Sequence, residues 1–210
     1  MEKTEARRQL ILNQIADHLL AAGLKDASLR HLAAAIGTSD RMLLHYFVDK
    51  DELMTAALNV VAARLISLLE STRSNRMLFQ ALIPYLAGMI KDPGVRPYLR
   101  LWLELAAMSA ANDSYRRIAR QICDSFYEWI ASVLEVDSDD ERGPLAALAF
   151  ATIEGFVLLD SLDYGSKVDS ALQGIALRHS QGYRRLPGKR GGCWHVFLDK
   201  TCSECYNSIV

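Results

Sequence analysis

Between Ser28 and Leu53 the chain carries basic and hydroxyl side chains at a spacing suited to contacts with nucleic acid. Arg41 lies at the start of a short helical pattern, where its guanidinium can donate two hydrogen bonds to a guanine. Lys50 falls on the first position of the next helix, where free backbone N–H groups also favour an anion such as a phosphate. The residues expected to contact DNA are Ser28, Arg30, Thr38, Ser39, Asp40, Arg41, His45, Tyr46 and Lys50.

Some of these side chains have two possible roles. Asp40 would repel a phosphate, so it either accepts a hydrogen bond from a cytosine or orients Arg41. Arg30 either reaches the DNA backbone or pairs with a nearby acid. Tyr46 offers a hydroxyl at phosphate distance, whereas Phe47 is expected to fill a small core.

The helices that position these residues are marked by caps and glycines. A first helix is predicted over Thr4–Ala22, and Gly23 can take the left-handed conformation that ends it. Ser28 is expected to cap a second helix and Ser39 a third, very short one. Gly37 supplies the turn between them, where a positive φ costs it little.

Two further features are expected around this turn. Ala33 and Gly37 are four residues apart, and their small size would let the second and third helices approach closely. Asp49 and Glu52 form a capping-box pattern, with Asp49 as the N-cap of a long fourth helix. The sequence thus predicts a helix-turn-helix followed by a helix that begins beside it.

These residues resemble the N-terminal motif of the tetracycline-repressor (TetR) family of bacterial regulators. Leu44 stands where the family usually has a phosphate-contacting tyrosine, so we expect it to touch a thymine methyl or the core instead. Thr38 replaces a typical valine, and the order His45-Tyr46 also differs. The motif covers roughly the first quarter of the chain, at Ser28, Leu32, Ala33, Gly37, Ser39, Leu43, Phe47, Lys50 and Leu53.

The rest of the chain has helical periodicity up to about Ser180. About nine helices are predicted in all, and no segment alternates as a strand would. The polar run DSDDERG is expected to separate the seventh helix from an eighth that begins at Pro144. We expect an all-α fold with a helix-turn-helix domain at 1–48, a helical ligand-binding and dimerisation domain at 49–182, and an appended tail at 183–210.

The predicted eighth helix, 144–164, is apolar on nearly all sides and must be buried on several of them. The TetR resemblance implies that it forms half of an intermolecular four-helix bundle with the ninth helix. Burial within one monomer is the alternative. Since helix-turn-helix proteins usually bind two half-sites, a homodimer is expected.

The resemblance also implies a cavity for a small organic effector between the body helices. Large aromatic and Met side chains with a few acids would line it, although such residues are more often plain core. The candidates are Tyr85, Met89, Trp102, Glu104, Met108, Phe126, Trp129, Phe150 and Glu154.

Composition and motifs argue against several classes of protein. Half of the residues are hydrophobic and the net charge is −1, so any affinity for nucleic acid must come from a few placed contacts. No catalytic motif or cofactor fingerprint is present, and no enzyme is expected. The N-terminus lacks a signal peptide, and the apolar run Leu145–Leu159 is short and contains Glu154. We therefore expect a cytoplasmic protein without a membrane span.

The segment after Gly182 loses helical periodicity and is rich in glycine, basic residues and cysteine. Its Cys-x-x-Cys spacing suits half of a zinc site, but Cys-x-His places two ligands unusually close. A redox pair and an incidental tail are the alternatives, and the incidental tail is favoured. The weak zinc candidates are Cys193, His195, Cys202 and Cys205.

Together these patterns predict a DNA-binding transcriptional regulator. It would bind a palindromic operator as a dimer and be released, as a repressor, by a small ligand. The alternative is a helical protein-interaction or small-molecule-carrying module without an operator. The sequence reveals neither the operator nor the effector.

Overall fold

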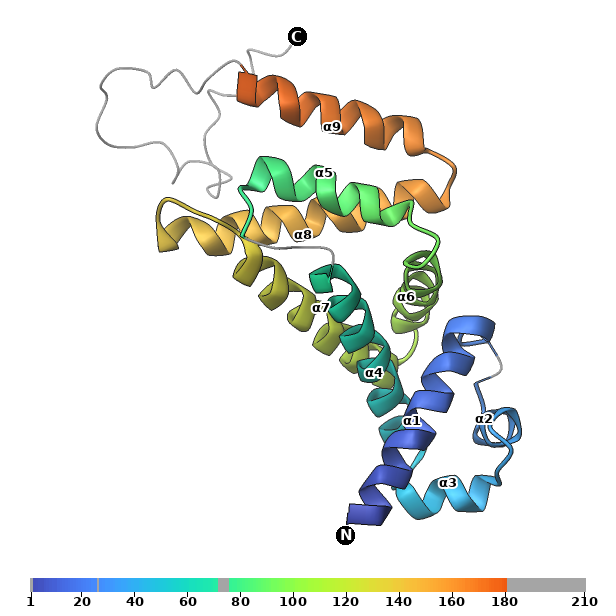
Figure 1. Cartoon of the computed structure of the whole chain (residues 1–210). Helices are drawn as coiled ribbons and strands as arrows, with labels where there is room; N and C mark the ends of the chain where they lie inside the picture. The colour runs from blue at the N-terminus through green and yellow to red at the C-terminus, as the bar shows by residue number, and fades with distance from the viewer. Residues whose placement is uncertain (1, 26, 72–75, 181–210) are drawn as a thin grey trace, which may run out of the picture.

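The structure is a computed structural model that describes residues 2–25, 27–71 and 76–180, with side chains described at 4–25, 27–71 and 76–176. These residues form an all-α fold, as predicted, together with an isolated β-bridge between Met77 and Leu134 (Figure 1). The nine helices of this part are α1 (Glu2–Ala22), α2 (Leu29–Ala35), α3 (Asp40–Tyr46), α4 (Lys50–Ser71), α5 (Phe79–Ile90), α6 (Arg96–Ser109), α7 (Asp113–Val133), α8 (Asp139–Ser161) and α9 (Gly165–Ser180).

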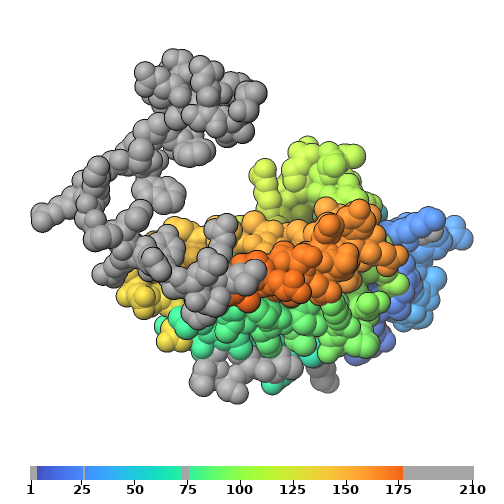
Figure 2. Space-filling view, turned by 90° about the horizontal axis from the view of Figure 1, so that it is seen from above, coloured from blue at the N-terminus to red at the C-terminus, as the bar shows by residue number. Residues whose placement is uncertain are grey.

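The molecule is elongated, with different helices at its two ends. Helices α1, α2 and α3 lie together at one end, at the bottom of Figure 1. Helices α5, α8 and α9 pack against one another at the other end, and α4, α6 and α7 connect the two. Seen from above that second end, α9 runs across the surface in orange, while the blue N-terminal helices protrude at one side (Figure 2).

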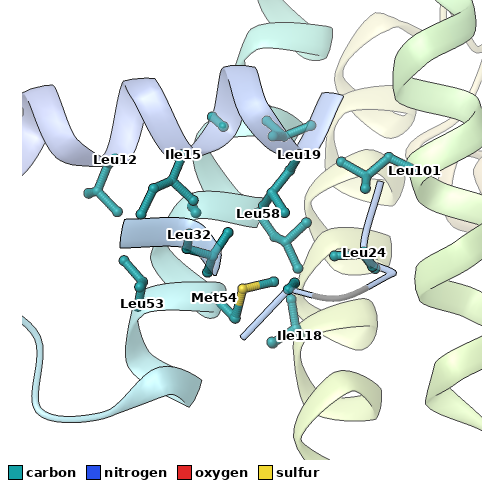
Figure 3. Close-up of a cluster of buried hydrophobic side chains, with 14 of the residues drawn as sticks. Leu12, Ile15, Leu19, Leu24, Leu32, Leu53, Met54, Leu58, Leu101 and Ile118 are labelled. Carbon is teal, nitrogen blue, oxygen red and sulfur yellow. The ribbon is translucent and has the colours of Figure 1, made fainter. Parts of the chain in front are cut away.

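A single hydrophobic cluster joins the N-terminal helices to the body (Figure 3). The inner face of α1 is buried at Leu12, Ile15 and Leu19. These side chains pack with Leu and Met residues of α2 and α4, and the cluster continues into α6 and α7 through Leu101, Leu105, Ile118 and Ile122. The N-terminal helices therefore share their core with the body, and each fully buried Leu or Ile adds roughly 1.5–3 kcal/mol of apolar burial.

The predicted helix ends around the turn are confirmed. Gly23 and Gly37 have positive φ of 83° and 69°, and Gly23 N donates to Leu19 O at 2.8 Å. Ser28 and Ser39 cap α2 and α3 through bonds from the third residue of each helix. The expected close approach at Gly37 is wrong, because a Cβ added there would meet nothing within 4 Å. A glycine is favoured at position 37 by its positive φ, and not by a lack of space for a side chain.

Residues just before α5 and α8 determine where these helices begin. Helix α5 begins at Phe79, after Met77, whose N–H donates to Val133 O and whose carbonyl accepts from Glu135 N. Helix α8 begins at Asp139 instead of Pro144, because Ser138 caps it and acidic residues fill its first turn. The polar run is thus the start of α8, since acidic side chains favour a helix N-terminus.

By length and hydropathy alone, α4 and α8 could each cross a membrane. The expectation that the apolar run is too short therefore fails for α8, which has 23 residues. The core helix of a soluble protein passes the same test, and α4 contributes eight buried residues to the core. The zinc candidates Cys193, His195, Cys202 and Cys205 lie outside the described residues.

Candidate DNA-binding surface and effector cavity

Helix α3 presents its polar residues on the surface at its N-terminal end. The Ser39 hydroxyl accepts a hydrogen bond from Met42 N at 3.2 Å, which fixes where the helix begins. Asp40 Oδ1 accepts from the backbone N–H of Arg41 at 2.8 Å, so this carboxylate binds the backbone in the first turn of α3. Ser39, Asp40 and Arg41 are all exposed.

The opposite side of α3 is anchored in the core. Leu43 and Phe47 are buried, whereas His45 is exposed and Tyr46 is half-buried with its ring edge-on to His45 at 5.1 Å. Leu44 is 48% exposed, so the core alternative for this residue is wrong. Helix α3 therefore turns a face with Arg41, Leu44 and His45 toward solvent.

The junction of α3 and α4 is fixed by the predicted capping box and by a residue that sequence reasoning missed. Asp49 Oδ1 accepts from Glu52 N at 2.8 Å, and Glu52 Oε2 accepts from Val48 N at 2.6 Å, one residue before the expected partner. Arg8 of α1 donates to Glu52 Oε1 at 3.0 Å and lies 4.8 Å from the centre of the Phe47 ring. Since Arg8 is 44 residues from Glu52 in the sequence, no local pattern predicts this contact.

The remaining predicted DNA contacts lie at the ends of neighbouring helices. Ser28 accepts from His31 N at 3.3 Å, and Arg30 is exposed on the first turn of α2. Thr38 is half-buried in the turn, and Lys50 is half-buried at the first position of α4. The structure thus gathers all nine candidates on α2, α3 and the start of α4.

Hydrogen bonds from Arg100 and to Glu104 join helix α6 to the C-terminal end of α1, and we call this set of bonds the α1–α6 contact. Arg100 Nη2 donates to Leu20 O at 2.7 Å and to Ala21 O at 3.0 Å. Leu24 N donates to Glu104 Oε2 at 2.7 Å. The guanidinium thus satisfies helix-terminal carbonyls, which matches the negative polarity of a helix C-terminus, and the carboxylate binds the free amide that follows the helix. Glu104, predicted to line a cavity, belongs to this contact instead.

A cavity of about 110 Å³ lies among α4, α5, α6, α7 and α8. Six of the nine predicted residues line it: Met89, Trp102, Phe126, Trp129, Phe150 and Glu154. Tyr85 instead donates to Leu69 O at 2.8 Å, and Met108 is 36% exposed on the surface. Tyr98 and Cys123 also line the cavity and were missed, because helical spacing alone does not separate cavity lining from core.

Glu154 is the charged side chain among the described residues that line this cavity. Its Oε2 accepts a hydrogen bond from Trp102 Nε1 at 2.7 Å. Burial raises the pKa of Glu154, and the bond from Trp102 opposes that rise. Burial also raises the pKa of the Cys123 thiol to about 11, with the charge of Glu154 adding to the effect. Trp129 Nε1 is buried without a partner among the described residues.

Comparison with known proteins agrees with this geometry. The model of the bacterial regulatory proteins of the tetR family matches residues 11–57, from within α1 to within α4. The HTH-type transcriptional regulator BetI of Cronobacter sakazakii is 28% identical over 159 residues, which is 70% of this chain and 74% of that protein. The family model thus covers the helix-turn-helix and the start of the body, and together with the BetI relative it supports a TetR-type regulator.

Solved structures share the fold of this chain. A transcriptional regulator from Rhodococcus sp. Rha1 superposes with a TM-score of 0.62 at 23% identity, over 83% of this chain and 96% of the other. A regulator from Saccharomonospora viridis, solved in complex with choline, gives 0.53 at 20% identity, over 82% and 94%. With the exposed α3 and its capped junction, the chain is a DNA-binding transcriptional regulator.

Proposed function

We propose that this TetR-family regulator represses transcription as a homodimer on a palindromic operator, and that a small organic molecule in the cavity releases it. The supporting observation is the placement of residues on α6. Trp102 and Leu105 line the cavity, while Arg100 and Glu104 hold the end of α1. Since these positions fall on different faces of one helix, a rotation of α6 moves both sites together.

On DNA, the N-terminal end of α3 enters the major groove. Ser39, Arg41 and His45 contact base edges from the exposed face of α3. Tyr46 and Lys50 contact phosphates at its far end, where α4 begins. The domain division at residue 48 then separates a DNA-binding part from a ligand-binding and dimerisation part, and the protein acts in the cytoplasm, where its operator lies.

In the proposed homodimer, the second protomer packs on α8 of the first. Exposed apolar and small residues recur along one side of this helix at Leu148, Ala151, Gly155, Leu158 and Leu162. Small residues in the middle of such a stripe let two helices approach closely, and a stripe of this kind is self-complementary about a two-fold axis. With α9 it would form half of an intermolecular four-helix bundle.

In this proposal the ligand shifts the population of the protein from a DNA-binding conformation to one that does not bind the operator. It binds a state of the body in which the two α3 helices no longer match half-sites about 34–36 Å apart. The choline found in the Saccharomonospora viridis regulator supports a small organic molecule as the effector class. No catalytic step is proposed.

The test is selection of operator sequences from genomic fragments, followed by gel shifts. Lys50→Ala should weaken binding evenly across sequences and reduce the salt slope by about one. Arg41→Ala should relax the base preference at one position, at a cost of roughly 1–3 kcal/mol. Lys91→Ala is the control, because Lys91 pairs with Asp169 at 3.2 Å at the opposite end of the molecule.

Three results would contradict this proposal. Selection of no sequence at any salt concentration would favour a protein-interaction or carrier module without an operator. Equal effects of Lys50→Ala and Lys91→Ala would remove the DNA-binding surface from α3 and α4. A monomer at micromolar concentration, alone and on its operator, would exclude the homodimer.

A further inference from the structure

We infer that the effector is a small organic cation, held among aromatic rings with the Glu154 carboxylate as its counter-ion. This inference rests on the proposed function of the cavity and names the chemical class of its ligand. It follows from three features of the cavity: an acid without a basic partner, the rings that surround it, and the volume.

The acid is the first feature. Glu154 projects from the middle of α8 into a cavity whose other described lining residues include no Lys, Arg or His. The ionisable groups beside it are Tyr98 from α6 and Cys123 from α7, and the lining residues of α4 and α5 are not ionisable. Glu154 is half-buried, and a partly desolvated carboxylate without a cation is costly, because desolvation disfavours its charged form. A cationic ligand would supply the missing charge.

The bond to Trp102 indicates which form of Glu154 the site is built to hold. Trp102 Nε1 can only donate, so it favours a carboxylate oxygen that accepts. That bond occupies Oε2, and the described residues show no hydrogen bond to Oε1. The indole therefore fixes the orientation of the acid while one oxygen remains for a ligand.

The rings are the second feature. Aromatic faces attract cations through their quadrupoles, by roughly 0.5–2 kcal/mol for each well-placed ring. Helices α6, α7 and α8 all contribute rings, so a central cation would contact aromatic carbon on several sides. These rings belong to Tyr98, Trp102, Phe126, Trp129 and Phe150.

The volume is the third feature, because it limits the size of the ligand. At about 110 Å³ the cavity is smaller than the roughly 300–1,000 Å³ typical of sites for drug-sized molecules. A compact ammonium ion with methyl substituents offers apolar surface to the walls and charge to Glu154. A large flat cation does not fit without movement of the helices.

The test compares ligands of one shape and different charge by isothermal titration calorimetry on the full chain. The probes are choline, other small quaternary ammonium ions and amines, and for each the neutral analogue in which carbon replaces nitrogen. At least one cation should bind about tenfold or more tightly than its neutral analogue, since a hydrogen-bonded or paired charge is typically worth that factor. Its affinity should increase from acidic to neutral pH, because the cation favours the ionised acid.

Glu154→Gln should reduce the difference between the cation and its neutral analogue to less than about threefold. Glu128→Gln is the matched control, because Glu128 is an exposed acid on the neighbouring helix α7. A gel shift with the same ligands distinguishes the proposed function, release of DNA by a ligand, from the inference that this ligand is a cation. Neutral molecules that bind in the cavity and release DNA would leave the proposed function standing and overturn this inference. Equal binding of the two members of every pair, or no binding by any cation, would also overturn it.

Discussion

Replacing Gly23 by alanine tests how tightly α6 holds the end of α1. Gly23 has a φ of 83°, and an added Cβ would lie 2.7 Å from Oε1 and 2.9 Å from Cδ of Glu104. The positive φ costs an alanine roughly 1–2 kcal/mol. Displacing the carboxylate from Leu24 N costs roughly 1.5–3 kcal/mol more, the usual value for a hydrogen bond to a charged group. Gly23→Ala should therefore destabilise the protein by about 2.5–5 kcal/mol.

The assay is urea denaturation followed by circular dichroism, arranged as a double-mutant cycle. In a Glu104→Ala background the Gly23→Ala change should cost only about 1–2 kcal/mol, because the crowding carboxylate is gone. Gly37→Ala is the control, since its φ is 69° and an added Cβ there meets nothing within 4 Å. It should also cost about 1–2 kcal/mol.

Two outcomes would refute this reasoning. If Gly23→Ala and Gly37→Ala cost the same, crowding by Glu104 contributes nothing to stability. If Glu104→Ala leaves the cost of Gly23→Ala unchanged, the contact with Leu24 N does not couple the two residues. Either result would also weaken the proposed connection between the cavity and the DNA-binding helices.

Three further predictions concern other parts of the molecule. Glu52→Ala should destabilise the protein by about 1–3 kcal/mol in urea, because a backbone hydrogen bond and an ion pair are lost, whereas Glu70→Ala at an exposed site of the same helix should stay within about 0.5 kcal/mol. Leu158→Glu should shift the protein from dimer to monomer in light scattering, since a charge would enter the proposed α8 interface; an unchanged dimer would exclude α8. Cys123, with its pKa raised to about 11, should be alkylated slowly at pH 8, where only about one thiol in a thousand is ionised. Peptide mass spectrometry would measure this rate, and alkylation as fast as that of a free thiol would contradict the burial of this side chain.

The sequence was sufficient where a residue acts on its immediate neighbours. The caps at Ser28 and Ser39 and the positive φ of Gly37 were predicted because each follows from the chemistry of two to four consecutive residues. The capping box at Asp49 was predicted for the same reason. These local signals also carry the family motif, so the helix ends of the helix-turn-helix were the best predicted part of the molecule.

Prediction failed where a partner lies far along the chain. The family resemblance predicts Glu104 in the cavity lining, yet its partner Leu24 is 80 residues away. Proline favours the first turn of a helix and therefore predicts a start at Pro144, but Ser138 with the acids behind it is the stronger start signal. Only the role of Glu104 depends on tertiary packing, because the Ser138 cap is made with Asp140, two residues away.

The connection between the cavity and the DNA-binding helices has the same long-range origin. Leu58 of α4 and Leu101 and Leu105 of α6 line the cavity, and they also belong to the hydrophobic cluster that holds α1 and α2. Because protein interiors are close-packed, a ligand that displaces these side chains must also change the packing under the N-terminal helices. The α1–α6 contact then determines how that change reaches α1, since Arg100 and Glu104 tie its last turn to α6. A regulator built in this way needs no separate path between its two sites, because one core serves both.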